Sequence, residues 1–270
     1  MKTKILIITI IITSIISCKD DNVVENLEQQ NLQSSSDYLL IEKTLIDIQR
    51  IVEHSLISNG ITKNCITYKV KNNDPLNTDT LITDFGEVNC LHLGQLNRGK
   101  IITIYSDYIH DSSAIINNTF DNFYLNNNLI QGNIILENLG PNINQDYIYN
   151  LDINNISVTT HNGIINLNAN YKKTLINGGS TKYQYLDDVY LIAGSAEGNS
   201  VNNNNFNMQI TDSLTINNAC FESSKCVITK GKSTISTDIY EDRELDYGNN
   251  LCDCKVNIEI NNEPYLIVLD

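Results

Sequence analysis

Short runs in which apolar and polar residues alternate dominate this chain from Cys65 onward. Alternation with a period of two places every second side chain on one face of an extended strand. Isoleucine, valine, threonine and tyrosine favour strands, whereas asparagine and glycine tolerate the positive φ of tight turns. The clearest runs are 65–70, 100–105, 119–124, 164–168 and 255–260, and the turn candidates are 126–128, 161–163, 177–179 and 261–262. Pro264 cannot donate a ladder hydrogen bond, so its run is expected at a sheet edge. The pattern predicts an all-β body, mainly an antiparallel meander or sandwich-like sheet, over residues 61–270.

One amphipathic helix is predicted ahead of the strands, over residues 37–60. Its apolar residues recur at steps of three and four, at Tyr38, Ile41, Leu45, Ile48, Val52 and Leu56. Ser36 or Asp37 is placed to cap the start, and the Asn-Gly pair at 59–60 supplies a stop. The polar face carries the carboxylates of Glu42, Asp47 and Glu53. We therefore expect the apolar stripe to pack on the sheet and the carboxylates to lie on the other side.

The N-terminus has the pattern of an export signal. Lys2 and Lys4 precede an apolar run, Ile5 to Ser17, which is shorter than the roughly 20 helical residues that span a bilayer. The end of this run, Ile-Ile-Ser-Cys at 15–18, resembles a bacterial lipobox. The resemblance implies a signal peptide over 1–17, a lipid-modified Cys18, and a flexible tether over 18–36. The alternative is a soluble secreted protein whose signal happens to precede a cysteine.

The residues after Cys18 indicate a destination. Lys19, Asp20 and Asp21 resemble the Lys-acidic-acidic export signal of Bacteroidetes surface lipoproteins, which implies transfer to the outer face of the outer membrane. The chain has 32 acidic and 18 basic residues, a net charge of −14. Such a charge argues against a nucleic-acid partner, because binding to phosphates requires lysine and arginine to replace counterions. The expected membrane contact is therefore made by the lipid anchor.

The cysteines predict disulfide bonds. Of seven cysteines, Cys18 is set aside for the lipid, and an even set remains in an exported chain: Cys65, Cys90, Cys220, Cys226, Cys252 and Cys254. Zinc is the alternative, but the close pairs have C-x₅-C and C-x-C spacing rather than that of a structural zinc site.

An internal repeat suggests which cysteines pair. The segments 84–90 and 246–252 both read Asp-aromatic-Gly-x₃-Cys, and each follows another cysteine at a similar distance. If the two units are equivalent, Cys65 pairs with Cys90 and Cys226 with Cys252, which leaves Cys220 for Cys254. Within each unit we expect the aspartate to bond its own backbone two residues on, the glycine to take positive φ, and the ring to face the core.

No catalytic set is predicted, and no cofactor or metal site. The four histidines, at positions 54, 92, 110 and 161, are far apart in sequence and are expected at the surface or in turns. The segment Gly-Ser-Ala-Glu-Gly at 194–198 does not have the G-x-S-x-G spacing of a hydrolase elbow. Asp187 and Asp188 have the chemistry to hold Ca²⁺ with a loop carbonyl, but a solvated turn is the preferred interpretation.

Several segments of the body resemble Bacteroidetes (flavobacterial-type) outer-membrane surface lipoproteins of unknown function. They are the Asp84–Cys90 segment, Arg-Gly-Lys at 98–100, Thr-Phe-Asp-Asn-Phe-Tyr at 119–124, Asp-Asp-Val-Tyr at 187–190 and the late segment 246–253. The resemblance spans most of residues 60–270 and implies an antiparallel β body, but no activity.

The sequence leaves three roles open. The first is a non-enzymatic interaction or structural role for a lipid-anchored outer-membrane lipoprotein, with a protein or glycan partner that remains unknown. The second is a carrier of lipid or another hydrophobic ligand, which predicts an apolar cavity between helix and sheet. The third is a calcium-dependent glycan-binding accessory protein, which predicts exposed tyrosine beside carboxylates.

Overall fold

The computed structural model describes residues 21–58, 65–72, 78–223 and 226–269, with side chains from Leu32 onward. The expected signal peptide, Cys18, Lys19 and Asp20 lie outside the described residues, as does the Asn-Gly pair at 59–60. Asp21, the last residue of the expected export signal, is the first residue of helix α1, Asp21–Ile57.

Within these described ranges, fourteen strands form one antiparallel sheet in which nearly every strand lies beside its neighbour in sequence. The strands are β1 (Thr67–Asn72), β2 (Asp79–Asp84), β3 (Cys90–His92), β4 (Gln95–Tyr105), β5 (Ile115–Leu125), β6 (Asn128–Pro141), β7 (Tyr147–Thr160), β8 (Gly163–Asn177), β9 (Val189–Asn199), β10 (Asn205–Asn217), β11 (Ile228–Thr237), β12 (Arg243–Asn249), β13 (Lys255–Ile260) and β14 (Glu263–Val268). Two 3₁₀ turns, η1 (Tyr185–Asp187) and η2 (Asn218–Glu222), lie in the connections. The short β3 pairs with β4 beside the main path, which runs directly from β2 to β4. The predicted all-β class, with its antiparallel meander and one N-terminal helix, is confirmed.

The alternation in sequence becomes alternation in burial. Along β13 the side chains of Val256, Ile258 and Ile260 are buried, and the residues between them are exposed. The predicted turns at 126–128 and 261–262 form, with positive φ at Asn126 and Asn127 in the first and at both asparagines of the second. Among the described strands, β1 pairs only with β2 and β14 only with β13, so the sheet has two free edges and Pro264 lies at one of them, as predicted.

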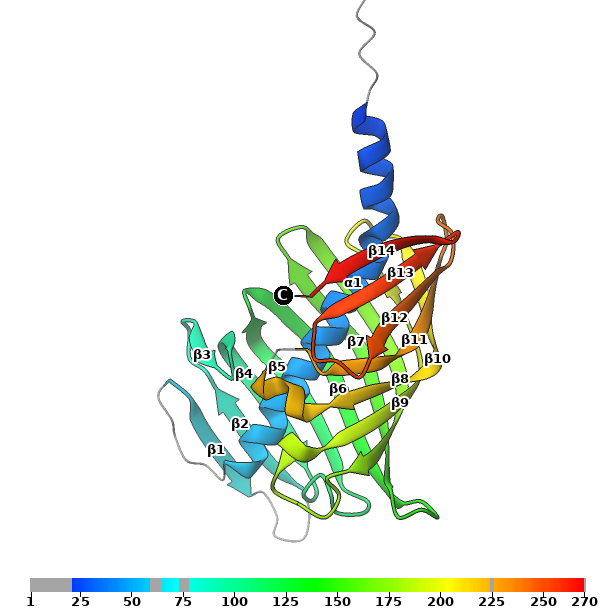
Figure 1. The fold of residues 1–270 in the computed structure, drawn as a ribbon. Coiled ribbons are helices and arrows are strands. Elements are labelled where there is room, and N and C mark those ends of the chain that lie inside the picture. Colours follow the sequence, from blue (N-terminus) through cyan, green and yellow to red (C-terminus); the bar gives the residue numbers. More distant parts are fainter. Residues whose placement is uncertain (1–20, 59–64, 73–77, 224–225, 270) are drawn as a thin grey trace, which may run out of the picture.

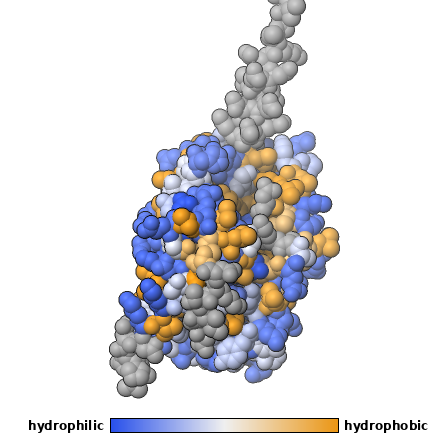
Figure 2. Space-filling view, turned by 90° about the vertical axis from the view of Figure 1, so that its left-hand side faces the viewer, coloured by the Kyte–Doolittle hydropathy of each residue, from blue (hydrophilic) through white to orange (hydrophobic). Residues whose placement is uncertain are grey.

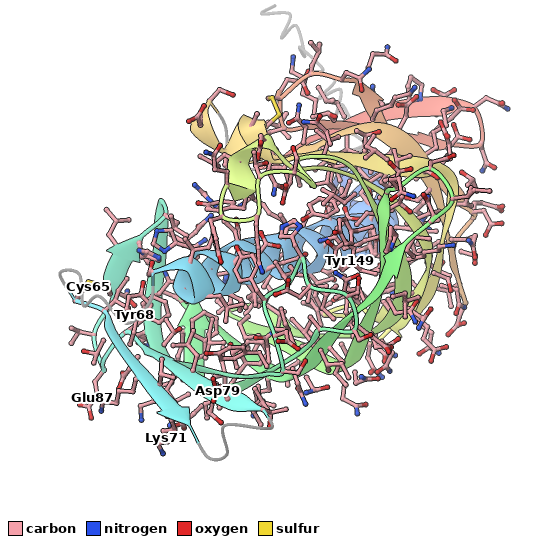
Figure 3. The ribbon with its side chains drawn as sticks, turned by 90° about the horizontal axis from the view of Figure 1, so that it is seen from below. Cys65, Tyr68, Lys71, Asp79, Glu87 and Tyr149 are labelled. Atoms are coloured by element: carbon pink, nitrogen blue, oxygen red, sulfur yellow. A yellow bond between two sulfur atoms is a disulfide. The ribbon has the colours of Figure 1, made fainter. Side chains whose placement is uncertain are left out.

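Helix α1 lies inside the curve of this sheet (Figure 1). Seen from below, the sheet wraps around the helix, with Tyr149 on the side of the sheet that faces it (Figure 3). Register shifts at the middle of β7, β10 and β11 bend the strands. Such bulges increase local twist and bending, which allows one long sheet to curl around a single helix.

The helix begins earlier than predicted. It starts at Asp21 rather than at 37 and ends at Ile57, so residues 21–36, expected as part of a flexible tether, are helical. Asp37 is not an N-cap but lies within the helix, where its carboxylate accepts a hydrogen bond from the Val201 amide at 2.8 Å. The side chains of Ser34 and Ser35 are fully buried. Tertiary packing thus covers the helix at Ser34 and Ser35, ahead of the segment that has an apolar stripe.

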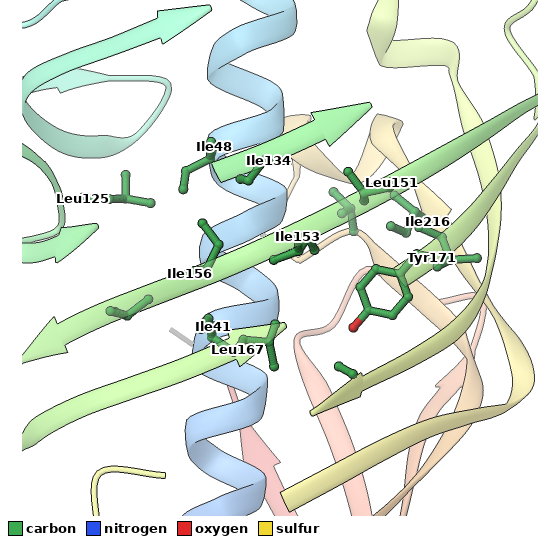
Figure 4. Close-up of a cluster of buried hydrophobic side chains, with 14 of the residues drawn as sticks. Ile41, Ile48, Leu125, Ile134, Leu151, Ile153, Ile156, Leu167, Tyr171 and Ile216 are labelled. Atoms are coloured by element: carbon green, nitrogen blue, oxygen red, sulfur yellow. The ribbon is translucent and has the colours of Figure 1, made fainter. Parts of the chain in front are cut away.

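The core lies between α1 and the sheet. Ile41 and Ile48 of the helix face apolar side chains of the central strands (Figure 4), including Ile153 on β7 and Leu167 on β8, and all four are buried. Tyr38 and Val52 of the predicted stripe are buried as well, whereas Leu45 and Leu56 are partly covered. Each fully buried large apolar side chain contributes about 1.5–3 kcal/mol, so this interface is the main source of stability for the body.

All six cysteines predicted to form disulfides do so, but only one predicted pair is correct. Cys65 bonds to Cys90, as predicted. The other two bonds are Cys220–Cys252 and Cys226–Cys254, not Cys226–Cys252 and Cys220–Cys254. The prediction assumed two antiparallel neighbours with nested pairs. Instead, Cys220 lies in the 3₁₀ turn η2, so the path from Cys220 to Cys226 is not a strand that runs against Cys252–Cys254.

The repeated Asp-aromatic-Gly units adopt the same local structure. The Gly86 amide donates to Asp84 Oδ1 at 2.9 Å, and the Gly248 amide donates to Asp246 Oδ1 at 2.8 Å. Both glycines have positive φ, at 77° and 90°. The rings of Phe85 and Tyr247 are buried. The repeat therefore predicts local conformation correctly although it fails to predict the second disulfide.

We predict that non-reduced peptide mapping of the oxidised protein will recover Cys220–Cys252 and Cys226–Cys254. Replacing Cys220 and Cys252 together by serine should lower the free energy of unfolding by about 3–4 kcal/mol, because this bond closes a loop with a sequence separation of 32 residues. Denaturant unfolding measures the loss. The matched Cys65→Ser/Cys90→Ser variant should lose a similar amount, and peptides that join Cys226 to Cys252 would contradict the structure.

Candidate functional site

The three acidic residues predicted on the polar face of α1 meet the surrounding protein, contrary to expectation. Asp47 and Glu53, expected on a polar face away from the core, are buried, and Glu42 is partly buried. Asp47 accepts hydrogen bonds from Lys43 at 3.0 Å and from Gln95 of β4 at 2.9 Å. The helix is surrounded by a curved sheet rather than laid on a flat one, so its polar face also meets protein.

The first polar cluster, which we call the Glu42 cluster, consists of Glu42 and three tyrosines. Tyr38 donates its hydroxyl proton to Glu42 Oε1 at 2.8 Å, and Tyr247 of β12 donates to Oε2 at 2.9 Å. Tyr171 of β8 lies next to Tyr38, with 3.4 Å between the hydroxyl oxygens. Burial raises the pKa of Glu42 from 4.5 to about 7, although both tyrosine hydrogen bonds act to lower it.

The second polar cluster, the Asp188 cluster, lies near the C-terminal half of α1. Tyr190 of β9 donates to Asp188 Oδ2 at 2.8 Å, and His110 Nε2 lies 3.8 Å from the same oxygen. The ammonium of Lys173, on β8, lies over the Tyr190 ring, 3.9 Å from its centroid. Glu53 of the helix completes the cluster through its attraction to Lys173. A histidine, a lysine and two carboxylates are thus buried together.

Burial is the largest cause of the pKa shifts in this cluster. It raises the pKa of Asp188 to about 7, with the charge of Glu53 as the next cause. It lowers the pKa of Lys173, which Glu53 and Asp188 act to raise. It also lowers the pKa of His110, and the Lys173 charge adds to that effect. Buried groups whose pKa values shift toward the neutral form occur in structural cores as well as in active sites.

A small apolar cavity lies between α1 and the sheet. Its volume is about 60 Å³, and its walls are mostly aliphatic, with Val52 from the helix and Ile134, Leu151 and Ile192 from the sheet. Apolar cavities of about 150 Å³ accept a benzene-sized guest. The cavity therefore has the chemistry that a hydrophobic ligand requires, but not the room for an acyl chain in this conformation.

The structure brings some of the sequence-separated histidines into contact. The rings of His54 and His92 meet edge to face, with 5.0 Å between their centroids, and His110 is buried beside Asp188. His110 thus lies in a turn, as one of the two expectations had it, but it is buried rather than at the surface, whereas His161 is exposed in a turn. A turn at the start of β9 does hold Asp187 and Asp188, but Asp188 is buried rather than solvated.

The described part of the chain offers no metal site and no membrane-crossing helix. No group of three or more histidine, cysteine, aspartate or glutamate side chains converges there in a way that would hold a metal ion. Nor does any described helix combine the length and apolarity that crossing a bilayer takes.

Sequence reasoning missed the sheet residues that interact with the helix carboxylates, namely Lys173 with Glu53 and Tyr247 with Glu42. Tyr247 was predicted to face the core as the ring of an Asp-aromatic-Gly unit, but no partner was predicted for it or for Lys173. One signal was present for Lys173, which lies at a position that β8 buries between apolar neighbours, Tyr171 and Leu175. A lysine on the inner face of a strand indicates a buried carboxylate opposite it, because an unpaired buried charge is costly.

The Glu42 cluster generates a prediction about pH. Between the unfolded pKa of 4.5 and the folded value of about 7, the folded chain retains a proton that the unfolded chain has released. The contribution of Glu42 to stability is therefore present below pH 4.5 and is lost as the pH rises toward 7. Glu42→Gln should remove this dependence, stabilise the protein at pH 8 by about 1–3 kcal/mol, and change it little at pH 4.

Denaturant unfolding across this pH range measures the effect of Glu42→Gln. Glu259→Gln, at an exposed position on β13, is the matched control and should leave the pH profile unchanged. Equal pH profiles of stability for the wild type and Glu42→Gln would contradict the prediction, because they would show that Glu42 ionises in the folded protein without loss of stability.

Comparison of the chain with models of protein families, with curated proteins and with solved structures gives no match.

Proposed function

We propose that this chain is a lipid-anchored outer-membrane lipoprotein, exposed at the cell surface, whose body has a non-enzymatic interaction or structural role. The lipobox-like segment ending at Cys18 and the Lys-Asp-Asp segment after it support the location. The proposed lipid on Cys18, rather than a membrane-spanning helix, holds the protein at the membrane. Several acyl chains are needed for stable anchoring, because a single chain binds only marginally.

The observation that carries the proposal is the continuity of α1. The helix begins at Asp21, three positions after Cys18 (21 − 18 = 3), and runs for 37 residues into the core. At about 1.5 Å per residue, it is about 55 Å long. Its first turns project beyond the sheet (Figure 1). A lipid on Cys18 would thus be joined to the body by a helix that the core holds, which favours presentation of the body at a set distance from the membrane.

The packing around α1 favours an interaction module over a carrier. A carrier needs room for its ligand, whereas the cavity between helix and sheet has a volume of only about 60 Å³. The helix also makes specific polar contacts, through Glu42 with β12 and through Asp37 with the turn between β9 and β10, and these would break if it moved out. The helix therefore fills the position that a carrier would give to its ligand.

The surface offers apolar contact area as well. On the face shown in Figure 2, hydrophobic residues gather in the middle and hydrophilic residues border them. Val88 and Leu91, next to the Cys65–Cys90 bond, are 76% and 68% exposed. Exposed apolar patches with polar borders are typical of surfaces that bind a partner.

A carrier of lipid or another hydrophobic ligand is the second candidate, and the apolar lining of the cavity favours it. Ligand entry would require α1 to move away from the sheet. The third candidate remains a calcium-dependent glycan-binding accessory protein; among the described residues, no group of three or more histidine, cysteine, aspartate or glutamate side chains converges to favour it.

Location and anchoring can be tested in cells that express the full chain. We expect metabolic labelling with a fatty acid to mark the protein, and added protease to remove the body from intact cells. Cys18→Ala should abolish the label and the membrane attachment. Asn22→Ala, just beyond the export signal, is the matched control and should change neither. A labelled protein that external protease leaves intact would face the periplasm and would make the carrier role the better proposal.

The two candidate roles differ in what co-purifies with the body. We expect organic extraction of the purified, folded chain, followed by mass spectrometry, to release no lipid in stoichiometric amount, because the covalent lipid stays with the protein. Stoichiometric release of a non-covalent lipid would overturn the interaction role in favour of the carrier. The detergent alone, carried through the same extraction, gives the background.

A further inference from the structure

A polar groove lies on the outer face of the sheet, over the middle of β7 to β11. Its volume is about 580 Å³, within the range of about 300–1,000 Å³ typical of small-ligand sites. We propose that this groove binds a neutral, hydroxyl-rich ligand, a short oligosaccharide, through a grid of amide and hydroxyl side chains. The inference rests on the proposed function in one respect, namely that the outer face of the body is presented to solutes outside the cell.

The grid follows from strand register. One row crosses four strands at Asn170, Ser195, Gln209 and Thr234, each the direct partner of the next. A second row, two residues along, crosses the same strands at Asn168, Glu197, Asn207 and Ser236. Neighbouring strands are about 4.8 Å apart, and alternate residues on a strand are about 7 Å apart. The groove thus presents hydrogen-bonding groups at regular intervals on a rigid scaffold.

The chemistry of the grid selects the ligand. Asparagine and glutamine both donate and accept hydrogen bonds, as do serine and threonine, so they match hydroxyl groups in either role. No lysine or arginine lines the groove, whereas Asp152 and Glu197 do. An anionic ligand would meet two carboxylates without a compensating cation, and an apolar ligand would leave the amides unpaired. A neutral polyol avoids both problems, because it carries no negative charge and its hydroxyl groups pair with the amides.

Several of these side chains are held in position before a ligand binds. Asn168 Oδ1 accepts a hydrogen bond from the Asn155 amide at 2.7 Å, which fixes the side chain and leaves its exposed amide nitrogen as a donor. Gln209 donates to the Gly194 carbonyl at 3.1 Å. Asn170 donates to Asp152 at the edge of the groove. Side chains that are already ordered lose less entropy on binding.

The calcium-dependent alternative predicted exposed tyrosine beside carboxylates, and this groove has no aromatic lining residue. Recognition here relies on hydrogen bonds alone. Each hydrogen bond to the ligand contributes about 1 kcal/mol when it replaces a hydrogen bond to water. We therefore expect dissociation constants in the micromolar to millimolar range, without a requirement for metal.

The experiment is titration of the full chain, in a zwitterionic rather than a sugar-based detergent, with neutral oligosaccharides of glucose, mannose, galactose and xylose. Side-chain amide signals in ¹H–¹⁵N spectra report the site. We expect at least one oligosaccharide to shift the Asn168 and Asn207 signals and to bind equally well with a chelator present. Oligogalacturonate, the acidic counterpart of the galactose series, should bind at least about tenfold more weakly, since Glu197 and Asp152 repel it.

The variant Asn168→Ala/Asn207→Ala should weaken binding by about tenfold or more. It should lower the unfolding midpoint only slightly, because both side chains are exposed and a single hydrogen bond, from the Asn155 amide to Asn168, is lost. The matched control, Asn117→Ala/Asn257→Ala, removes two asparagine amides outside the groove and should change affinity less than about twofold. Absence of binding at millimolar concentration for the whole panel would overturn the proposal, as would equal affinity of the two double variants. Neither result depends on whether Cys18 carries lipid, so failure of this inference is distinguishable from failure of the anchoring proposal.

Discussion

The contact between α1 and the inner face of the sheet is the interaction on which the rest of the structure depends. A curved antiparallel sheet buries one face only if something fills its concave side. Here a single helix does so, and the core cluster runs from Tyr38 at one end of the contact to Val52 at the other. Without the helix, the inner row of each central strand would be exposed to water. The sheet and the helix therefore cannot be treated as separate folding units.

The same contact explains why α1 is less amphipathic than its stripe suggests. Because the sheet curves around the helix, polar positions such as Glu42, Asp47 and Glu53 also meet protein. Each carboxylate has hydrogen-bonding or charged partners, from tyrosine, glutamine or lysine, which offset the loss of hydration. Buried polar groups of this kind need not add net stability, but they are satisfied in one helix register only. We regard them as the feature that fixes how α1 sits in the sheet.

The two edge strands of the sheet have features that discourage pairing with another chain. β1 carries exposed Lys69 and Lys71, and β14 carries Pro264; each discourages pairing with another chain. Disulfides hold the connections near both edges, Cys65–Cys90 beside β3 and the two others beside β13. Because disulfides hold the edges and the protein's own helix covers the inner face, the outer face is the part of the sheet that other molecules can contact. This arrangement accords with a role in binding rather than in transport of a ligand through the core.

The sequence by itself determined the class of fold, the hairpin turns, the edge position of Pro264, the oxidised state of six cysteines and the local form of both Asp-aromatic-Gly units. These features depend on short-range rules: strand period, the positive φ that asparagine and glycine allow, and the missing amide of proline. Tertiary structure alone decided the early start of α1, the burial of its carboxylates, the partners of Cys220 and Cys226, and the outer grid around Asn168 and Asn207. Each of these depends on which strands become neighbours and how far the sheet curls. Residues that are far apart in the chain meet only then, so no local pattern records them.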